Sequence, residues 1–492
     1  MPTPTCRAGL AALWLAACAV PVDVGPDQGG SEVDTDPATP GGAEGLPTTP
    51  VAPRRELRGL WIATVWNLDF PSRQDLDAAG ARAELEGLAD LAVTAGLNAL
   101  FLQVRPEGDA LYASAHEPWS HVLTGTQGAD PGFDPLALLV DAARARGLEV
   151  HAWLNPFRAR AASPAMVAPH LGAVHPEAVV AYGDGHWMDP GRPEVQERLV
   201  AVVRDLARSG VEGIHLDDYF YPYPVAGTPF PDAATHAASG SALGLADWRR
   251  ANVASAVHAV AEAVRAEDPT VRFGISPFGI YRPGQPPGVT GFDAWAGLYA
   301  DPLAWLAAGD VDYLAPQLYW PTTSSGQPFG ALAGWWWAQA DGRAWTFVGL
   351  DLSRLGSSAA WTREELALQV TTGRAQGATG VVLFRAEHLA MEDRAAWLRA
   401  GVFAEPALPP PHHGVDATVR APEATLEGRT LRLRHRDPVP LRGWAVFGDD
   451  GEGWVLERVA QGDALALEPG RWAVAALTRL DTLSAARIVE VD

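Results

Sequence analysis

The chain has 492 residues, 48% of them hydrophobic, and its 37 basic residues, all arginine, face 59 acidic ones to give a formal net charge of −22. This length exceeds the ~250–300 residues at which a single core stops growing, so more than one domain is predicted. The negative charge and the lack of a dense arginine run exclude a nucleic-acid partner and argue against any polyanion, which favours an uncharged or amphoteric polymer as substrate.

The N-terminus carries the pattern of an export signal. Residues 8–17 form an apolar run behind Arg7 that is too short to span a bilayer and has the length of a signal-peptide core. The run ends in Leu15-Ala16-Ala17-Cys18, which resembles a bacterial lipobox and implies cleavage before Cys18 and diacylation of its sulfur. The sequence therefore predicts a signal peptide over residues 1–17 and attachment to a membrane through a lipid on Cys18. An ordinary signal peptide with a chance cysteine is the alternative.

The segment that follows is predicted to be a disordered tether over residues 18–55. It is rich in Pro, Gly, Thr, Asp and Glu and has few large apolar residues, so burial cannot offset the entropy of ordering it. The only cysteines are Cys6, in the signal peptide, and Cys18, the first residue of the tether. The folded body therefore has no disulfide and no cysteine site, and the sequence predicts neither a metal site nor any other cofactor.

From residue 57 onward, short β-prone apolar runs alternate with amphipathic helical stretches, which is typical of repeated βα units around a parallel sheet. Eight runs are predicted as strands: residues 57–65, 99–105, 149–155, 213–217, 272–277, 312–317, 346–350 and 380–384. Eight units predict an α/β fold, a (β/α)8 barrel over residues 56–404. A doubly wound open sheet is the alternative, but the first strand is followed by bulky residues rather than a Gly-rich turn.

The carboxyl ends of these runs are polar, and catalytic groups of such barrels lie at those ends. Alternation along the fourth run places His215 and Asp217 toward the lumen. A buried carboxylate is costly unless it is paired or functional, so Asp217 is predicted as the catalytic centre, with Arg105 as an ion-pair partner that lowers its pKa. Asp218, its sequence neighbour, points elsewhere along a strand; it is expected to turn toward the site in the loop, to orient an N-acetyl group, or to cap the next segment.

The loop after the second run offers two further carboxyl groups, Glu107 and Asp109, as candidates for a general acid beside Asp217. For each of them, a solvated loop carboxylate is the alternative. The predicted substrate-binding side chains come from the same strand ends and the loops after them: Trp61, Gln103, Arg105, His151, Trp153, Asn155, His215, Tyr219, Tyr221, Gln317, Tyr319 and Trp320.

Several strings at these strand ends, in matching order, resemble the glycosyl-hydrolase-like 10 family. They are Arg58-Gly59-Leu60-Trp61, Gln103-Val104-Arg105-Pro106, Gly108-Asp109-Ala110-Leu111-Tyr112, Pro118-Trp119-Ser120, His151-Ala152-Trp153-Leu154-Asn155-Pro156, Asp217-Asp218-Tyr219-Phe220-Tyr221-Pro222 and Ala315-Pro316-Gln317-Leu318-Tyr319-Trp320. The resemblance covers about residues 55–490 and implies an envelope lipoprotein that cleaves peptidoglycan glycan strands stripped of their stem peptides. The chain departs at the eighth run, where Phe384-Arg385-Ala386-Glu387-His388 replaces the family's Ser, Tyr and Asn.

The C-terminal part is predicted to be a separate domain. A proline-rich linker over residues 405–414 is followed by short alternating strands over residues 415–492, which predict a small β-sandwich of fibronectin type III character. The whole chain is expected to act as a monomer in the cell envelope. Two rival functions stay open: a glycan-binding lipoprotein without catalysis, and a hydrolase of another polysaccharide.

Overall fold

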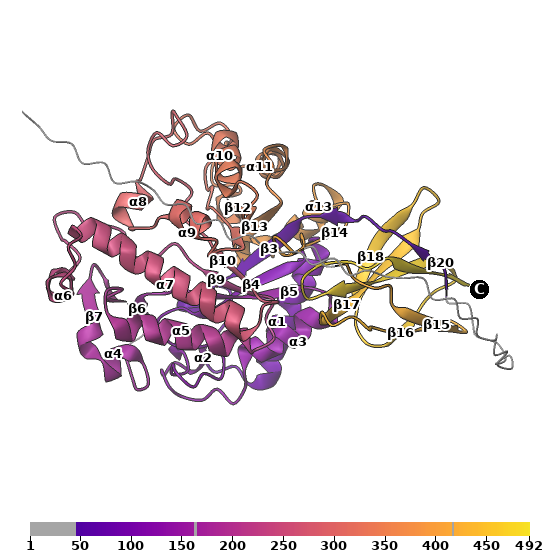
Figure 1. The fold of residues 1–492 in the computed structure, drawn as a ribbon, viewed down its shortest axis with the longest axis horizontal. Coiled ribbons are helices and arrows are strands. Elements are labelled where there is room, and N and C mark those ends of the chain that lie inside the picture. Colours follow the sequence, from indigo (N-terminus) through magenta and orange to yellow (C-terminus); the bar gives the residue numbers. More distant parts are fainter. Residues whose placement is uncertain (1–45, 162–164, 416–417) are drawn as a thin grey trace, which may run out of the picture. The chain divides into compact units, whose positions relative to one another are not determined.

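The computed structural model describes residues 46–161, 165–415 and 418–492, so the predicted signal peptide, Cys18 and most of the predicted tether lie outside the described residues. Its centre is a closed barrel of eight parallel strands, coloured from indigo to orange in Figure 1. In chain order they are β3 (Leu57–Ile62), β4 (Ala99–Arg105), β5 (Glu149–Leu154), β9 (Gly213–Leu216), β10 (Arg272–Ile275), β11 (Tyr313–Leu314), β12 (Trp345–Asp351) and β13 (Gly380–Phe384). The predicted (β/α)8 barrel is confirmed.

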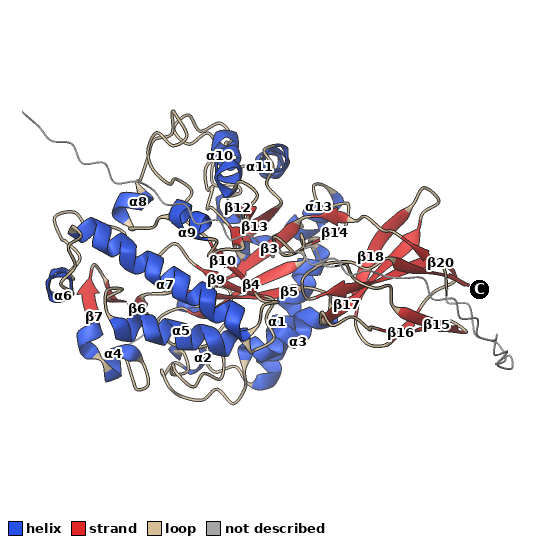
Figure 2. Ribbon diagram, in the orientation of Figure 1, coloured by secondary structure: helices blue, strands red, loops and turns tan. Residues whose placement is uncertain are grey.

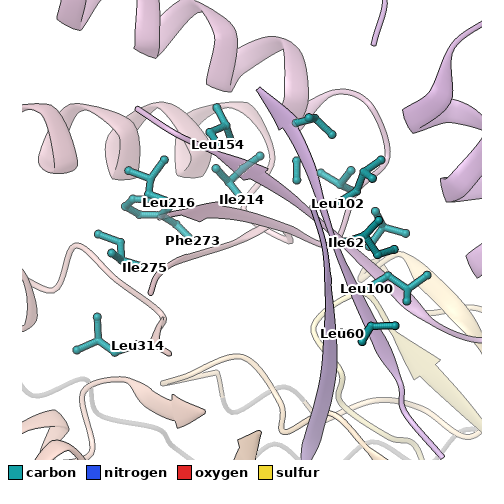
Figure 3. Close-up of a cluster of buried hydrophobic side chains, with 14 of the residues drawn as sticks. Leu60, Ile62, Leu100, Leu102, Leu154, Ile214, Leu216, Phe273, Ile275 and Leu314 are labelled. Atoms are coloured by element: carbon teal, nitrogen blue, oxygen red, sulfur yellow. The ribbon is translucent and has the colours of Figure 1, made fainter. Parts of the chain in front are cut away.

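Both faces of the barrel wall are apolar, as expected for a parallel sheet covered by helices. Figure 3 shows the outer face, where Leu60, Leu102 and Ile214 belong to the core between strands and helices. Side chains of opposite parity, among them Phe101 and Tyr313, form a second apolar cluster inside the barrel. The barrel is therefore filled, and a ligand can enter only at its rim.

The helices cover the outside of the barrel, as the blue ribbons in Figure 2 show. Asp77 and Asp134 cap α1 and α3 by accepting hydrogen bonds from Gly80 N and Ala137 N. The helices are α1 (Ala78–Thr94), α2 (His121–Thr124), α3 (Pro135–Ala145), α4 (Leu171–Val174), α5 (Pro193–Ala207), α6 (Ala233–Ala238), α7 (Leu245–Glu267), α8 (Ala294–Gly297), α9 (Pro302–Ala308), α10 (Phe329–Ala340), α11 (Arg363–Ala375), α12 (Ala386–Leu389) and α13 (Arg394–Ala400). Short 3-10 turns are η1 (Val65–Asn67), η2 (Pro176–Ala178) and η3 (Leu352–Arg354). No helix within the described residues is long and apolar enough to cross a membrane.

The connection from β5 to β9 contains a small sheet that the sequence did not reveal. Strands β6 (Arg158–Arg160), β7 (Val179–Tyr182) and β8 (Gly185–Met188) pair antiparallel in the order β6-β8-β7. The insertion leaves from the carboxyl end of β5, where catalytic groups of such barrels are found. It is therefore placed to form one wall of a site.

The C-terminal part folds into two sheets around an apolar core that contains Leu431, Trp444 and Val474. One sheet has the order β1-β21-β20-β17-β18, and the other has the order β15-β16-β19. The strands are β1 (Thr48–Thr49), β15 (Glu423–Glu427), β16 (Thr430–Arg434), β17 (Leu441–Asp449), β18 (Trp454–Ala460), β19 (Ala464–Ala466), β20 (Gly470–Thr478) and β21 (Ala486–Val491). The fibronectin type III character stays a prediction.

The predicted tether over residues 18–55 is wrong for its last ten residues, because two short strands within them pair with the C-terminal half of the chain. Strand β1 pairs with β21, and β2 (Arg54–Arg55) pairs with β14 (Ala407–Leu408). The predicted linker is also packed, since carbonyls of its prolines accept hydrogen bonds from Arg55, Arg272 and Trp345. Backbone pairing, which leaves no mark in composition, orders both segments.

Candidate active site

A cleft of about 600 Å³ opens at the carboxyl ends of the barrel strands. Eight of the sequence-predicted site residues line it: Trp61, Gln103, Trp153, Asp217, Asp218, Tyr219, Gln317 and Tyr319. Its walls come from the turn after β3, from the β6-β8-β7 insertion and from the segment after β9. The cleft joins apolar and aromatic walls to two buried carboxyl groups at its base.

Asp217 is held in one orientation by neutral donors. Asn155 Nδ2 donates to Asp217 Oδ2 at 2.9 Å, and the backbone N–H of Asp218 donates to Oδ1 at 2.8 Å. Gln103 Nε2 fixes the amide of Asn155 from the other side at 2.6 Å. Only 7% of Asp217 is exposed, so the carboxylate is desolvated on one side and faces the cleft on the other.

Asp218 is the more buried of the two carboxyl groups, with 3% of its surface exposed. The hydroxyl of Tyr223 donates to its Oδ2 at 2.6 Å. Burial, and then the negative charge of Asp217, raise the pKa of Asp218 well above its ordinary value. The site therefore combines a carboxylate with a neighbour that keeps its proton at higher pH, which is the division of roles that glycoside hydrolysis requires.

Two predicted histidines lie beneath the cleft and do not line it. His215 contacts Trp61 Nε1 at 3.2 Å and Tyr313 Oη at 3.1 Å, and His151 contacts the same hydroxyl at 2.9 Å. Burial lowers the pKa of His151 to about 3, and that of His215 also falls well below its ordinary value. Both rings are neutral near pH 7 and support the floor of the site.

The predicted ion pair between Arg105 and Asp217 is wrong. Arg105 Nη2 lies 2.8 Å from Glu117 Oε1, and its Nη1 donates to the carbonyls of Asn155 and Pro156. The register of β4 against β5 shifts between Gln103 and Arg105. Such a bulge breaks the alternation of side chains, so Arg105 turns away from the cleft while Gln103 keeps facing it.

Glu107 and Asp109, the predicted general-acid candidates, are also not in the cleft. Both are fully buried, and Glu107 Oε1 accepts a hydrogen bond from the backbone of Ala161, behind the wall. Tyr221 and Trp320, two of the predicted binding residues, pack elsewhere: Tyr221 contacts Asp232, and Trp320 packs on Phe278. The motifs at the strand ends predicted that these four residues lie near the site. Side chains in a loop beyond a strand end, however, do not alternate in direction as they do within a strand.

Sequence reasoning missed several residues of the cleft: Trp66, Leu68, Arg158, Arg160, Tyr182, Trp187, Tyr223, Ser276 and Phe384. Arg158 lies over the ring of Tyr219 at 4.9 Å, and Trp187 stacks on the same ring. At the end of the eighth barrel strand, where residues 384–388 differ from the family pattern, Phe384 stacks on Tyr319 and Arg385 pairs with Asp69. The end of the eighth strand therefore supplies an aromatic wall.

Trp66 stands out on this rim because 58% of it is exposed, an unusual state for a tryptophan. It and Asn67 both adopt positive φ, at 55° and 53°, which strains residues with a side chain. The side-chain amide of Asn67 holds this turn by donating to the carbonyls of Pro71 and Val122. An exposed ring fixed at the mouth of a cleft is a suitable surface for the C–H face of a sugar.

Replacing Trp66 by Ala is expected to raise KM for a glycan oligomer about 3- to 10-fold with little change in kcat, because an aromatic contact contributes about 0.5–1.5 kcal/mol. Steady-state kinetics on oligomers of defined length would measure this. Trp337, which is 51% exposed on α10 and does not line the cleft, is the matched control, and its Ala variant is expected to behave as wild type. Equal effects of both substitutions would remove Trp66 from the binding surface.

Comparison with known proteins identifies the family to which the chain is similar. The glycosyl hydrolase-like 10 family matches residues 56–361. Glycosyl hydrolase YngK of Bacillus subtilis (strain 168) is 40% identical over 294 residues, which are 57% of this chain and 58% of that protein. Glycosyl hydrolase DigH of Escherichia coli (strain K12) is 35% identical over 322 residues, 61% of this chain and 73% of that protein.

A search of solved structures finds the endo-1,4-beta-mannanase from Rhizomucor miehei, with a TM-score of 0.48, 12% identity, and coverage of 73% of this chain and 98% of that one. The region matched in glycosyl hydrolase YngK covers 58% of that protein, which is less than two thirds of its length.

Proposed function

Since the chain belongs to the glycosyl hydrolase-like 10 family, we propose that it is a glycoside hydrolase that cleaves peptidoglycan glycan strands stripped of their stem peptides. The observation that carries the proposal is the Asp217–Asp218 pair at the base of an aromatic cleft. Asp218 donates its proton to the oxygen of the leaving sugar, and Asp217 stabilises the positive charge that develops at the anomeric carbon.

The charges of the cleft support the choice of strands without peptides. Arg158 and Arg160 both line it, and Arg158 Nε is buried without a hydrogen-bond partner. Removing the stem peptide from a muramic acid residue frees a lactyl carboxylate, which an arginine can bind through charge-assisted hydrogen bonds. The net charge of −22 belongs to the whole chain, whereas a ligand in the cleft would meet Arg158 and Arg160 at short range. The earlier argument from net charge against an anionic polymer therefore does not extend to the cleft.

We further propose that the protein acts in the cell envelope, attached to a membrane through a lipid on Cys18. Only the Leu15-Ala16-Ala17-Cys18 string supports this, and it lies outside the described residues. In cells fed a labelled fatty acid, the wild-type chain is expected to carry the label and to sediment with membranes. Labelling that persists in Cys18→Ala would reject the assignment.

The activity is tested with residues 45–492, which form one compact unit, on purified sacculi before and after an amidase has removed the stem peptides. Starting at residue 45 keeps β1 paired with β21. Wild type is expected to release fragments, mainly from amidase-treated sacculi, and Asp217→Asn to release none. Mass spectrometry of the fragment ends identifies the bond that is cut.

Each other outcome changes the proposal in a defined way. Binding of both proteins to the glycan without release of fragments would replace the hydrolase by a glycan-binding protein. Release from another polysaccharide alone would reject peptidoglycan as the substrate. Equal release from treated and untreated sacculi would reject the role given to Arg158 and Arg160.

A further inference from the structure

Three side chains that offer metal-ligating atoms meet behind one wall of the cleft. Glu107 and Asp109 lie in the loop after β4, and His121 is the first residue of α2. One ligand atom from each lies within 4.8 Å of the other two. Glu107 and Asp109 are 0% exposed and His121 is 6% exposed, so the group is closed off from solvent.

Two atoms of this cluster are buried without a hydrogen-bond partner, namely Asp109 Oδ1 and His121 Nδ1. His121 Nδ1 faces the carboxylates at 3.9 Å from Asp109 Oδ2 and 4.0 Å from Glu107 Oε2, which is beyond hydrogen-bond distance. A buried polar atom without a partner is costly, and native proteins rarely leave one unless a water or an ion satisfies it. The two unpartnered atoms therefore indicate a ligand between the three side chains.

The donor set identifies the class of ligand. Two carboxylate oxygens and one imidazole nitrogen suit a divalent metal ion such as Zn²⁺ or Mn²⁺. Bond lengths of about 2.0–2.2 Å around such an ion place neighbouring ligand atoms roughly 3.3 Å apart. The His121 separations of 3.9 and 4.0 Å are wider, and all three ligand atoms lie within 4.8 Å of one another, so the side chains would draw closer together around an ion.

The surroundings indicate what an ion here would do. Glu107 Oε1 accepts a hydrogen bond from the backbone of Ala161 at 3.0 Å, and Ala161 lines the cleft. The side chain of Gln127 donates to Asp109 Oδ2 at 3.3 Å and accepts from Val167 N at 2.9 Å. Both carboxylates are thus tied to the backbone of the insertion wall.

We propose that Glu107, Asp109 and His121 bind one divalent metal ion of the zinc or manganese class, which braces the Arg158–Ala161 wall of the cleft. The ion is structural, because its ligands lie behind the wall and do not reach the cleft. The site does not depend on whether the chain cleaves glycans. The sequence predicted no metal site in the folded body, so the proposal departs from that prediction.

The test uses the full chain after treatment with a chelator, titrated separately with Zn²⁺ and with Mn²⁺ in a calorimeter. Wild type is expected to bind one ion per chain, and binding is expected to raise the midpoint of thermal unfolding by ~2 °C or more. Asp109→Asn and His121→Gln are expected to lose both the bound ion and the thermal shift. Elemental analysis of the dialysed protein gives an independent count of bound ions.

The matched control is His258→Gln, because His258 also faces a carboxylate, Asp310, at 2.8 Å. It is expected to keep the bound ion and the thermal shift. Any ion that binds elsewhere on the chain is common to wild type and variants, so it cancels in the comparison. Wild type that binds neither metal, or variants that bind as tightly as wild type, would overturn the proposal and leave His121 as an ion-pair partner of the two carboxylates. Circular dichroism of each metal-free variant verifies its fold.

Discussion

Asp218→Asn is expected to lower kcat on glycan strands roughly 10²- to 10⁴-fold, the contribution that a positioned general acid makes. The substitution keeps the shape of the side chain and the acceptor for Tyr223 but removes the acidic proton. KM is expected to change little, because Asp and Asn have the same shape at position 218 and the walls of the cleft stay as they are. Steady-state kinetics on solubilised strands of one length would measure both constants.

The pH profile separates the role of Asp218 from that of Asp217. The pKa of Asp218 is raised, first by burial and then by the charge of Asp217, so the group keeps its proton to a higher pH than an ordinary carboxyl. A general acid works only while protonated, so the wild-type rate is expected to fall as the pH rises through this pKa. Asp218→Asn is expected to lose that alkaline limb and to keep the rest of the profile.

The leaving group provides a second, sharper test. An aryl glycoside with an acidic phenol leaves without protonation, so such a substrate is expected to restore much of the rate of Asp218→Asn. Asp217→Asn is expected to stay slow on the same substrate, because the charge at the anomeric carbon still develops. If the aryl glycoside rescued Asp217→Asn and not Asp218→Asn, the two roles would have to be exchanged.

The barrel could be predicted because its signal repeats along the chain. Each strand is an apolar run that ends in polar residues, and the predicted bounds match those of β4 and β13, whereas the predicted runs at β3 and β11 extend past the strand ends. Alternation also placed Gln103 and His215 on the lumen side, where the structure has them. Both inferences rest on local geometry that holds for every residue inside a strand.

The parts of the site that could not be predicted lie where this geometry ends. Strand β9 stops at Leu216, so alternation predicted the place of Asp217 but left the direction of its neighbour Asp218 open, and both line the cleft. The bulge after Gln103 redirects Arg105 in the same way. Trp66 and the β6-β8-β7 wall depend on turn conformation and long-range pairing, for which neither composition nor periodicity carries a signal.

A buried charge network joins the C-terminal domain to the end of the barrel opposite the cleft. Arg272 and Glu149 begin the strands β10 and β5 and are almost fully buried. Asp481 accepts hydrogen bonds from Arg272 at 2.5 Å and from Arg442, and Arg442 also binds Glu149 at 2.8 Å. Two buried carboxylates thus bind two buried guanidinium groups, and removing one carboxylate leaves a buried guanidinium without a charged partner.

Asp481→Asn is therefore expected to lower the free energy of unfolding by about 3–5 kcal/mol. Asn keeps the shape of the side chain and tolerates the positive φ of 55° at this position, so the substitution isolates the loss of charge. Urea unfolding of residues 45–492, followed by tryptophan fluorescence, would measure the change. Glu427→Ala, which breaks the exposed pair with Arg432 in the same domain, is the control and is expected to leave the midpoint unchanged.

The effect on activity tells whether this network does more than hold the domains together. It lies at the barrel end remote from the cleft, where such folds place stabilising rather than catalytic groups. Folded Asp481→Asn is therefore expected to keep kcat within a few-fold of wild type at low temperature. The chain Glu149–His151–Tyr313–His215–Trp61 does connect the network to the cleft floor. A large loss of kcat in folded protein would show that these contacts set the position of Trp61, whereas an unchanged unfolding midpoint would show that the buried charges are not needed for stability.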